Sequence, residues 1–83
     1  MLGVFHEVSE ERSRQDRKWG EQNYHPAYWF VILGAEVGEM ANAFLESRQS
    51  DYRTELIHVA AVAIAAIESL DRGHWRSEQA TPA

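Results

Sequence analysis

Four side chains that can bind a metal ion occur as two pairs with the same spacing. Glu36 and Glu39 lie three residues apart in GAEVGEMANAF, and Glu55 and His58 lie three residues apart in TELIHVAAVAI. In an α-helix this spacing places two side chains about 60° apart, on one face. The neighbours on both faces are apolar, which predicts that the pairs point into the protein.

A buried carboxylate needs a partner. Without one it loses several kcal/mol of solvation, so either its pKa rises or a cation binds beside it. A divalent ion with oxygen ligands is the simplest solution for three glutamates. The alternative is that the pairs belong to solvated helix faces, as most glutamate pairs at this spacing do. The apolar neighbours favour the metal site.

Both pairs must also lie at a similar level of the fold. If the two helices that carry them form an antiparallel hairpin that turns near residues 49 and 50, the first pair lies level with residues 60–63. The second pair is then about five residues away along its helix, or ~7 Å. This distance allows the side chains to share one ion.

Three helices are needed to position these pairs. The sequence patterns predict helices over about 4–18, 26–48 and 50–72, with Pro26 opening the second and Gly73 ending the third. No segment alternates as a strand does. We expect an all-α fold, a small antiparallel bundle of about three helices, as one domain over residues 1–72, followed by a flexible C-terminal tail over residues 73–83.

The third segment is apolar on every side at its centre, LIHVAAVAIAAI, where eleven of twelve residues are apolar. Such a helix must be covered all round, and three helices cannot enclose one of their own. A domain of this size also buries only about 60% of the surface that its unfolded chain exposes. We therefore expect oligomerisation to complete the bundle, as a homodimer or homotetramer with Ala61 and Ala65 at the subunit interface.

The composition excludes several classes of partner. The net charge of -5 argues against a nucleic acid polymer, because phosphate backbones are held mainly by Lys and Arg. No segment has the roughly 18 apolar residues of a membrane span, and the N-terminus has no apolar run of a signal peptide. With no cysteine in the chain, a reducing compartment fits. We expect a cytoplasmic protein with no membrane partner, and a metal-bound nucleotide is compatible with its charge.

The spacing ExxE, fifteen intervening residues and ExxH resembles the ExxE…ExxD signature of the MazG-like all-α nucleoside triphosphate pyrophosphohydrolases. The similarity includes ERSRQDRKWGEQ and ELIHVAAVAIAAIE, and so extends almost to Arg72. It implies a dimeric or tetrameric bundle that uses Mg²⁺ to hydrolyse a (deoxy)nucleoside triphosphate to the monophosphate and pyrophosphate. It also implies that Glu36, Glu39 and Glu55 are catalytic and hold the metal.

His58 stands where this family usually has Asp. As a fourth ligand it would shift the metal preference from Mg²⁺ towards Mn²⁺, because Mg²⁺ prefers hard oxygens. As a hydrogen-bond partner of Glu55 it would leave the metal to the three glutamates. A non-catalytic alternative is also open, in which a helical oligomer binds a nucleotide or a protein partner and its metal site has decayed at His58.

Six further side chains are candidates to bind the triphosphate. They are Arg12, Gln15 and Lys18, which recur every three residues, and Trp19, His25 and Trp29 beyond them. The basic residues can reach a phosphate and the tryptophans can stack on a base. The alternatives are a solvated helix surface for Arg12 and Lys18, the core for both tryptophans and a helix cap for His25. Gln15 is favoured because it interrupts an apolar stripe.

Overall fold

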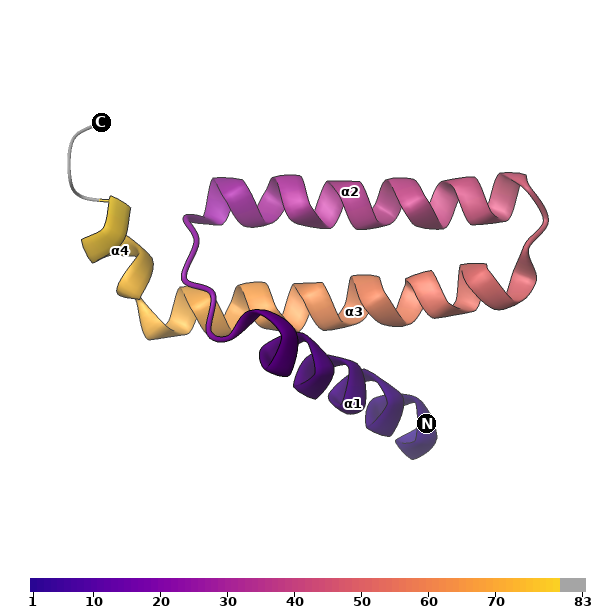
Figure 1. Cartoon of the computed structure of the whole chain (residues 1–83), viewed down its shortest axis with the longest axis horizontal. Helices are drawn as coiled ribbons and strands as arrows, with labels where there is room; N and C mark the ends of the chain where they lie inside the picture. Colours follow the sequence, from indigo (N-terminus) through magenta and orange to yellow (C-terminus); the bar gives the residue numbers. More distant parts are fainter. Residues whose placement is uncertain (80–83) are drawn as a thin grey trace.

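The part of the chain that the structure describes, residues 1–79, folds into four α-helices, as a computed structural model shows (Figure 1). They are α1 (Leu2–Trp19), α2 (Pro26–Leu45), α3 (Gln49–Arg72) and α4 (His74–Gln79). Within this part of the chain there is no strand, and no helix is both long and apolar enough to cross a membrane. The predicted all-α fold, with three long helices, is confirmed.

Two helix ends follow the turn residues in the sequence. Pro26 is the first residue of α2, and the imidazole of His25 accepts a hydrogen bond of 3.0 Å from the Ala27 amide. His25 therefore caps α2, which was the structural alternative for this residue. Gly73 follows α3 with a φ of 72°, the left-handed conformation that commonly ends a helix.

Two other ends differ from the prediction. α2 ends at Leu45 rather than near residue 48, because Ser47 has a φ of 57° and so cannot continue a right-handed helix. Residues 74–79 form α4 instead of an irregular tail. The half-buried ring of Trp75 stands edge-on to His25, with 5.1 Å between ring centroids, which holds α4 beside the start of α2. Residues 80–83 of the expected tail lie outside the described part.

α2 and α3 run antiparallel and pack along their length, and α1 crosses α3 at an angle (Figure 1). The core between α2 and α3 is formed by Trp29, Val62 and Ala65. This hairpin is the arrangement that the sequence predicts, and it brings the side chains of the two metal-binding pairs towards each other.

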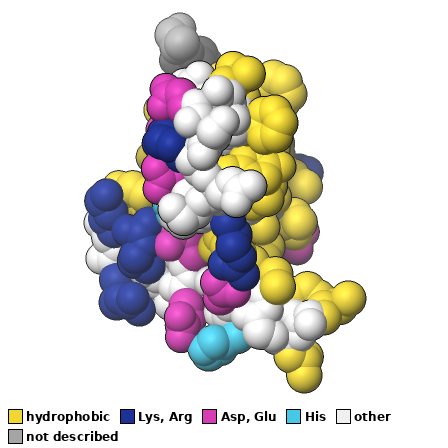
Figure 2. Space-filling model, turned by 90° about the vertical axis from the view of Figure 1, so that its right-hand side faces the viewer, with side chains coloured by type: hydrophobic (Ala, Val, Ile, Leu, Met, Phe, Trp, Pro, Cys, Tyr) yellow, Lys and Arg dark blue, Asp and Glu magenta, His cyan; other side chains and the backbone are white. Residues whose placement is uncertain are grey.

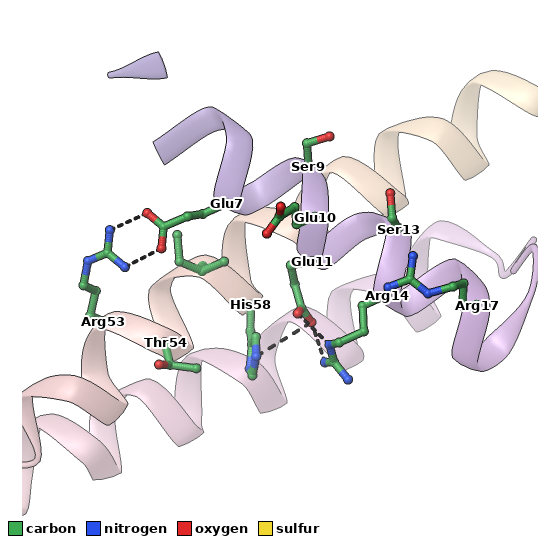
Figure 3. Close-up of a pocket in the computed structure, with 11 residues that line it drawn as sticks. Glu7, Ser9, Glu10, Glu11, Ser13, Arg14, Arg17, Arg53, Thr54 and His58 are labelled. Atoms are coloured by element: carbon green, nitrogen blue, oxygen red, sulfur yellow. Dashed lines mark hydrogen bonds and ion pairs between the residues drawn. The ribbon is translucent and has the colours of Figure 1, made fainter. Parts of the chain in front are cut away.

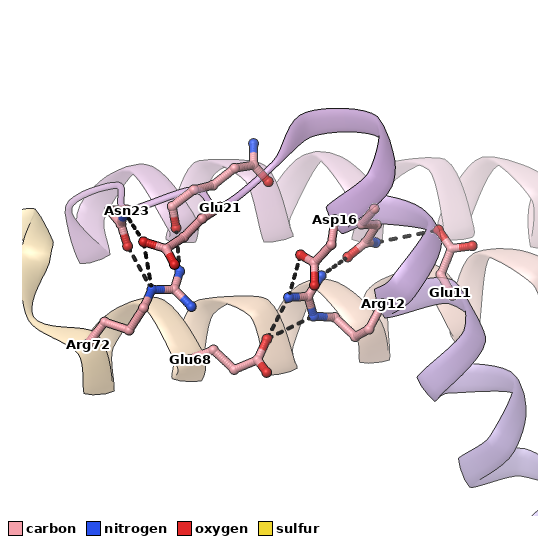
Figure 4. Close-up of polar contacts among 9 residues, drawn as sticks. Glu11, Arg12, Asp16, Glu21, Asn23, Glu68 and Arg72 are labelled. Carbon is pink, nitrogen blue, oxygen red and sulfur yellow. Dashed lines mark hydrogen bonds and ion pairs between the residues drawn. The ribbon is translucent and has the colours of Figure 1, made fainter.

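Ion pairs connect α1 to α3. Arg53 donates two hydrogen bonds of 2.7 Å to the carboxylate of Glu7. Arg12 donates to Glu68, with a Nε to Oε1 distance of 3.0 Å (Figure 4). The contact between α1 and α3 therefore includes charged side chains. α1 also contributes the buried Val8 to the interior.

The interior of the single chain is small. Among residues 1–76, whose burial the structure describes, six apolar side chains are buried: Val8, Trp29, Ala43, Ala61, Val62 and Ala65. Ala61 and Ala65 are only 0% and 7% exposed, because the packing of α1 and α2 on α3 already covers them. The expectation that these two alanines form a subunit interface is therefore wrong.

Enlarging Ala61 should destabilise the single chain. Ala61→Leu adds volume to a fully covered position and should lower the free energy of unfolding by about 1–3 kcal/mol. Ala35→Leu makes the same change at an exposed position of α2 and should cost less than about 0.5 kcal/mol. Urea-induced unfolding at one fixed protein concentration measures both. Equal losses in the two variants would contradict the core position of Ala61.

Candidate metal-binding site

The two predicted pairs meet in a cavity of about 370 Å³ that is lined by α1, α2 and α3. α2 contributes Glu36 and Glu39, and α3 contributes Glu55 and His58. All four line the cavity because the antiparallel hairpin places the pairs at similar levels, as the register of the sequence predicts. Apolar side chains, including Ile32, form other parts of the wall.

Three of these four residues offer ligand atoms to a single point. One oxygen of Glu36, one oxygen of Glu55 and one ring nitrogen of His58 all lie within 4.8 Å of one another. The Nδ1 atom of His58 is 3.4 Å from Glu55 Oε2 and 3.9 Å from Glu36 Oε2. Glu39 lines the same cavity but is exposed and lies outside this group. These distances suit both roles of His58, as a metal ligand and as a partner of Glu55.

The two glutamates of this group are short of hydrogen-bond donors. Glu36 and Glu55 each have a buried Oε2 atom without a hydrogen-bond partner. Burial raises the pKa of Glu36, and the nearby carboxylates of Glu39 and Glu55 raise it further. Ionised carboxylates are costly in such surroundings unless a cation or a donor compensates them. The donor set of two carboxylate oxygens and one imidazole nitrogen fits a divalent ion.

A further carboxylate reaches the cavity from α1. The side chain of Glu11 is 11% exposed, and its Oε2 atom lies 3.7 Å from Nε2 of His58 (Figure 3). Arg14 donates hydrogen bonds of 2.8 and 2.6 Å to the two oxygens of Glu11 and holds the pKa of that carboxyl below its usual value. Sequence reasoning missed Glu11. Glu11 precedes Gln15 by one helical turn, so it lies on the same face of the helix as the apolar stripe. This position could have indicated that its side chain points inward.

Gln15 and Arg12 have different positions, although both are candidates to bind substrate. Gln15 is 6% exposed and lines the cavity, with its amide nitrogen 3.5 Å from Glu11. Arg12 donates to Gln15, but its guanidinium is also paired with Asp16 and Glu68 (Figure 4). Arg12 does not line the cavity. Its side chain is only 14% exposed and its contact with Glu68 connects α1 to α3, which differs from the solvated helix surface that was its alternative.

The other four candidates for substrate binding also differ in their position relative to the cavity. Trp19 lines the cavity and is 52% exposed, so its ring is accessible to a planar ligand. Lys18 lies over that ring, with its Nζ atom 4.7 Å from the centroid, and is not part of the cavity wall. Trp29 is 5% exposed and belongs to the core, and its ring borders the cavity from inside. His25 lies outside the cavity.

Comparison of the chain with protein-family models, with curated proteins and with solved structures gives no match. The fold and the cavity define a small all-α protein with an acidic site between three helices. Its function is inferred from that site and from the spacing of its carboxylates.

Glu36 should make the metal-free protein less stable as the pH rises. The pKa of Glu36 in the folded protein is raised above the ordinary 4.5. At pH values between 4.5 and that raised pKa, the folded chain therefore binds more protons than the unfolded chain does. The free energy of unfolding therefore falls with increasing pH across that interval. Glu36→Gln removes this titration, and its free energy of unfolding should fall less as the pH rises above about 4.5.

Urea-induced unfolding in the presence of EDTA at several pH values measures this difference. Asp71→Asn, a change at an exposed carboxylate of α3, should keep the pH dependence of the unmodified protein. The same pH dependence in Glu36→Gln and in the unmodified protein would show that Glu36 does not titrate with a raised pKa.

Proposed function

We propose that the protein hydrolyses a (deoxy)nucleoside triphosphate to the monophosphate and pyrophosphate, with the help of Mg²⁺ or Mn²⁺. The observation that supports this most is the pair of buried carboxylate oxygens without donors, on Glu36 and Glu55, beside His58. The order and spacing of these residues resemble the signature of the MazG-like pyrophosphohydrolases. A metal-bound triphosphate also fits an acidic cavity, because the cation offsets the charge.

Glu36, Glu55 and His58 would hold the ion. A bound divalent ion would neutralise charge on the phosphate oxygens. Glu39 lines the cavity outside this group and is open to solvent. It is therefore the carboxylate best placed to orient a water molecule and accept its proton as the phosphoanhydride is attacked.

Arg14 is the best candidate to bind the phosphates. Of the Lys and Arg side chains within residues 1–79, Arg14 lines the acidic cavity, whereas Arg12 and Lys18 do not. Its side chain is 48% exposed, and it already binds the carboxylate of Glu11 through two nitrogens. A guanidinium binds phosphate with the same two-pronged geometry. In this proposal Arg14 replaces Arg12 and Lys18 as the phosphate ligand.

The purified protein should release pyrophosphate from at least one common nucleoside triphosphate when Mg²⁺ or Mn²⁺ is present, and not in EDTA. Glu55→Gln keeps the volume but removes a charged ligand, so it should lower kcat by at least about 100-fold. It should also abolish the rise in Tm that the metal produces. Glu46→Gln, at an exposed carboxylate outside the cavity, should change neither quantity.

Pyrophosphate release and the metal-dependent Tm together distinguish hydrolysis from nucleotide binding without catalysis. A metal-dependent rise in Tm without pyrophosphate release from any common ribo- or deoxyribonucleoside triphosphate would favour the non-catalytic, nucleotide-binding alternative. A Tm that no divalent ion changes would contradict the metal site itself.

Removing the guanidinium of Arg14 should weaken substrate binding. A hydrogen bond between charged groups contributes about 1.5–3 kcal/mol, so Arg14→Ala should raise KM about 10- to 100-fold. Arg17→Ala, at an exposed arginine on the same helix that lies outside the acidic cavity, should leave KM within about twofold. Steady-state pyrophosphate release measures both. An unchanged KM in Arg14→Ala would exclude Arg14 as a phosphate ligand.

A further inference from the structure

Two carboxylates of the acidic cavity differ from those on the surface of the molecule. Figure 2 shows acidic and basic side chains beside one another on one side of the molecule, with hydrophobic side chains gathered on the other. The exposed carboxylates of Glu7 and Asp51, for example, are paired with arginines at 2.7 and 2.8 Å. In the cavity, the buried Oε2 atoms of Glu36 and Glu55 have no hydrogen-bond partner. The group that lies nearest to these two oxygens therefore decides what the cavity can bind.

A ring nitrogen of His58 faces both of these oxygens. The Nδ1 atom lies 3.4 Å from Oε2 of Glu55 and 3.9 Å from Oε2 of Glu36, and neither contact is a hydrogen bond. A neutral imidazole carries its hydrogen on one nitrogen and a lone pair on the other. With the hydrogen on Nε2, lone pairs of three atoms converge in the cavity, and a divalent ion can accept all of them. With the hydrogen on Nδ1, the ring cannot bind an ion there.

The carboxylate of Glu11 lies at the other nitrogen of the His58 ring. Its Oε2 atom is 3.7 Å from Nε2, which is longer than a hydrogen bond but close enough for a strong electrostatic contact (Figure 3). An ionised carboxylate offers lone pairs only, so it attracts a nitrogen that carries a hydrogen and repels a nitrogen that carries a lone pair. Glu11 therefore favours the hydrogen on Nε2 and leaves Nδ1 free to bind an ion.

Two neighbours on α1 hold Glu11 in this position. Arg14 donates hydrogen bonds of 2.8 and 2.6 Å to its two oxygens, and the amide nitrogen of Gln15 lies 3.5 Å from Oε2. The hydrogen bonds from Arg14 keep the pKa of Glu11 below its usual value, so the carboxylate is ionised at neutral pH. Arg14 uses its Nε and Nη2 atoms for these bonds, which leaves Nη1 for a phosphate. Glu11 is thus a fixed negative charge beside His58.

We propose that Glu11 is a positioning residue of the metal site: it fixes the hydrogen of His58 on Nε2, so that Nδ1 binds a divalent ion together with the two buried carboxylate oxygens. The inference rests on the metal site of the proposed function, but it does not depend on hydrolysis. A carboxylate at the second nitrogen of a metal-binding histidine orients the ring and raises its basicity. Because Mg²⁺ prefers oxygen and Mn²⁺ accepts imidazole more readily, Glu11 should matter more for Mn²⁺ than for Mg²⁺.

Calorimetric titration of the full chain with Mn²⁺ and with Mg²⁺, without nucleotide, tests this role. Glu11→Met removes the acceptor but keeps an unbranched side chain, so it should raise the dissociation constant for Mn²⁺ about 10- to 100-fold and that for Mg²⁺ much less. Glu10→Met makes the same change at an exposed position of α1 outside the acidic cavity, and should leave both constants within about twofold. Equal losses for the two ions would overturn the proposal, because removal of a nearby charge weakens ions of equal charge equally.

A second comparison shows whether Glu11 acts through His58. His58→Asp offers an oxygen in place of the ring nitrogen, so this variant has no imidazole to orient. Adding Glu11→Met to His58→Asp should then change the Mn²⁺ dissociation constant by less than about threefold. A loss as large as the one measured with His58 present would show that Glu11 acts independently of the ring, and would overturn the proposal.

Because a variant can fail to fold, a third measurement uses the unmodified protein. Nitrogen-15 NMR of histidine-labelled protein with diamagnetic Zn²⁺ shows which nitrogen of His58 carries the hydrogen. We expect the hydrogen on Nε2 and the ion at Nδ1, and a hydrogen on Nδ1 would overturn the proposal. A protein that binds none of the three ions would contradict the metal site and the role of Glu11 with it. Ion binding with the expected properties but without pyrophosphate release would support the role of Glu11 and contradict only the hydrolysis.

Discussion

Close packing of α2 on α3 around Trp29, Val62 and Ala65 determines where the other parts of the molecule lie. Because the two helices are antiparallel neighbours, the pair Glu36 and Glu39 on α2 and the pair Glu55 and His58 on α3 face a shared space. The same contact turns a different stripe of each helix outwards. The acidic cavity and the exposed apolar stripe of each helix, which includes Phe30 on α2 and Ile67 on α3, are thus two results of one helix pairing, and a shift of one helix by a turn would displace both.

α1 forms the remaining wall of the cavity, and its contacts with α3 differ from those between α2 and α3. It supplies Glu11, Arg14 and Gln15 to the cavity wall, but its contacts with α3 include exposed ion pairs such as the one between Glu7 and Arg53. Exposed ion pairs contribute little to stability and are screened by salt. The part of the site that α1 contributes is therefore held less firmly than the part built on the α2–α3 hairpin.

Local patterns were sufficient to predict the helices and the level at which the acidic pairs meet. Pro26, Gly73 and the apolar periodicity act within a few residues, so their effects can be read along the chain. The position of Ala61 could not be read in this way, because a helix that is apolar on all sides does not show which side its own chain covers. The same holds for Arg12, whose orientation depends on Glu68, 56 residues later. Glu11 and α4 likewise depend on contacts between distant segments.

The ring of Trp29 is a wall that two spaces share. It borders the acidic cavity on one side and an apolar cavity near Phe30 on the other. Replacing this ring with a smaller side chain would therefore change both spaces at once, and any effect of such a variant on one space would have to be judged together with the other.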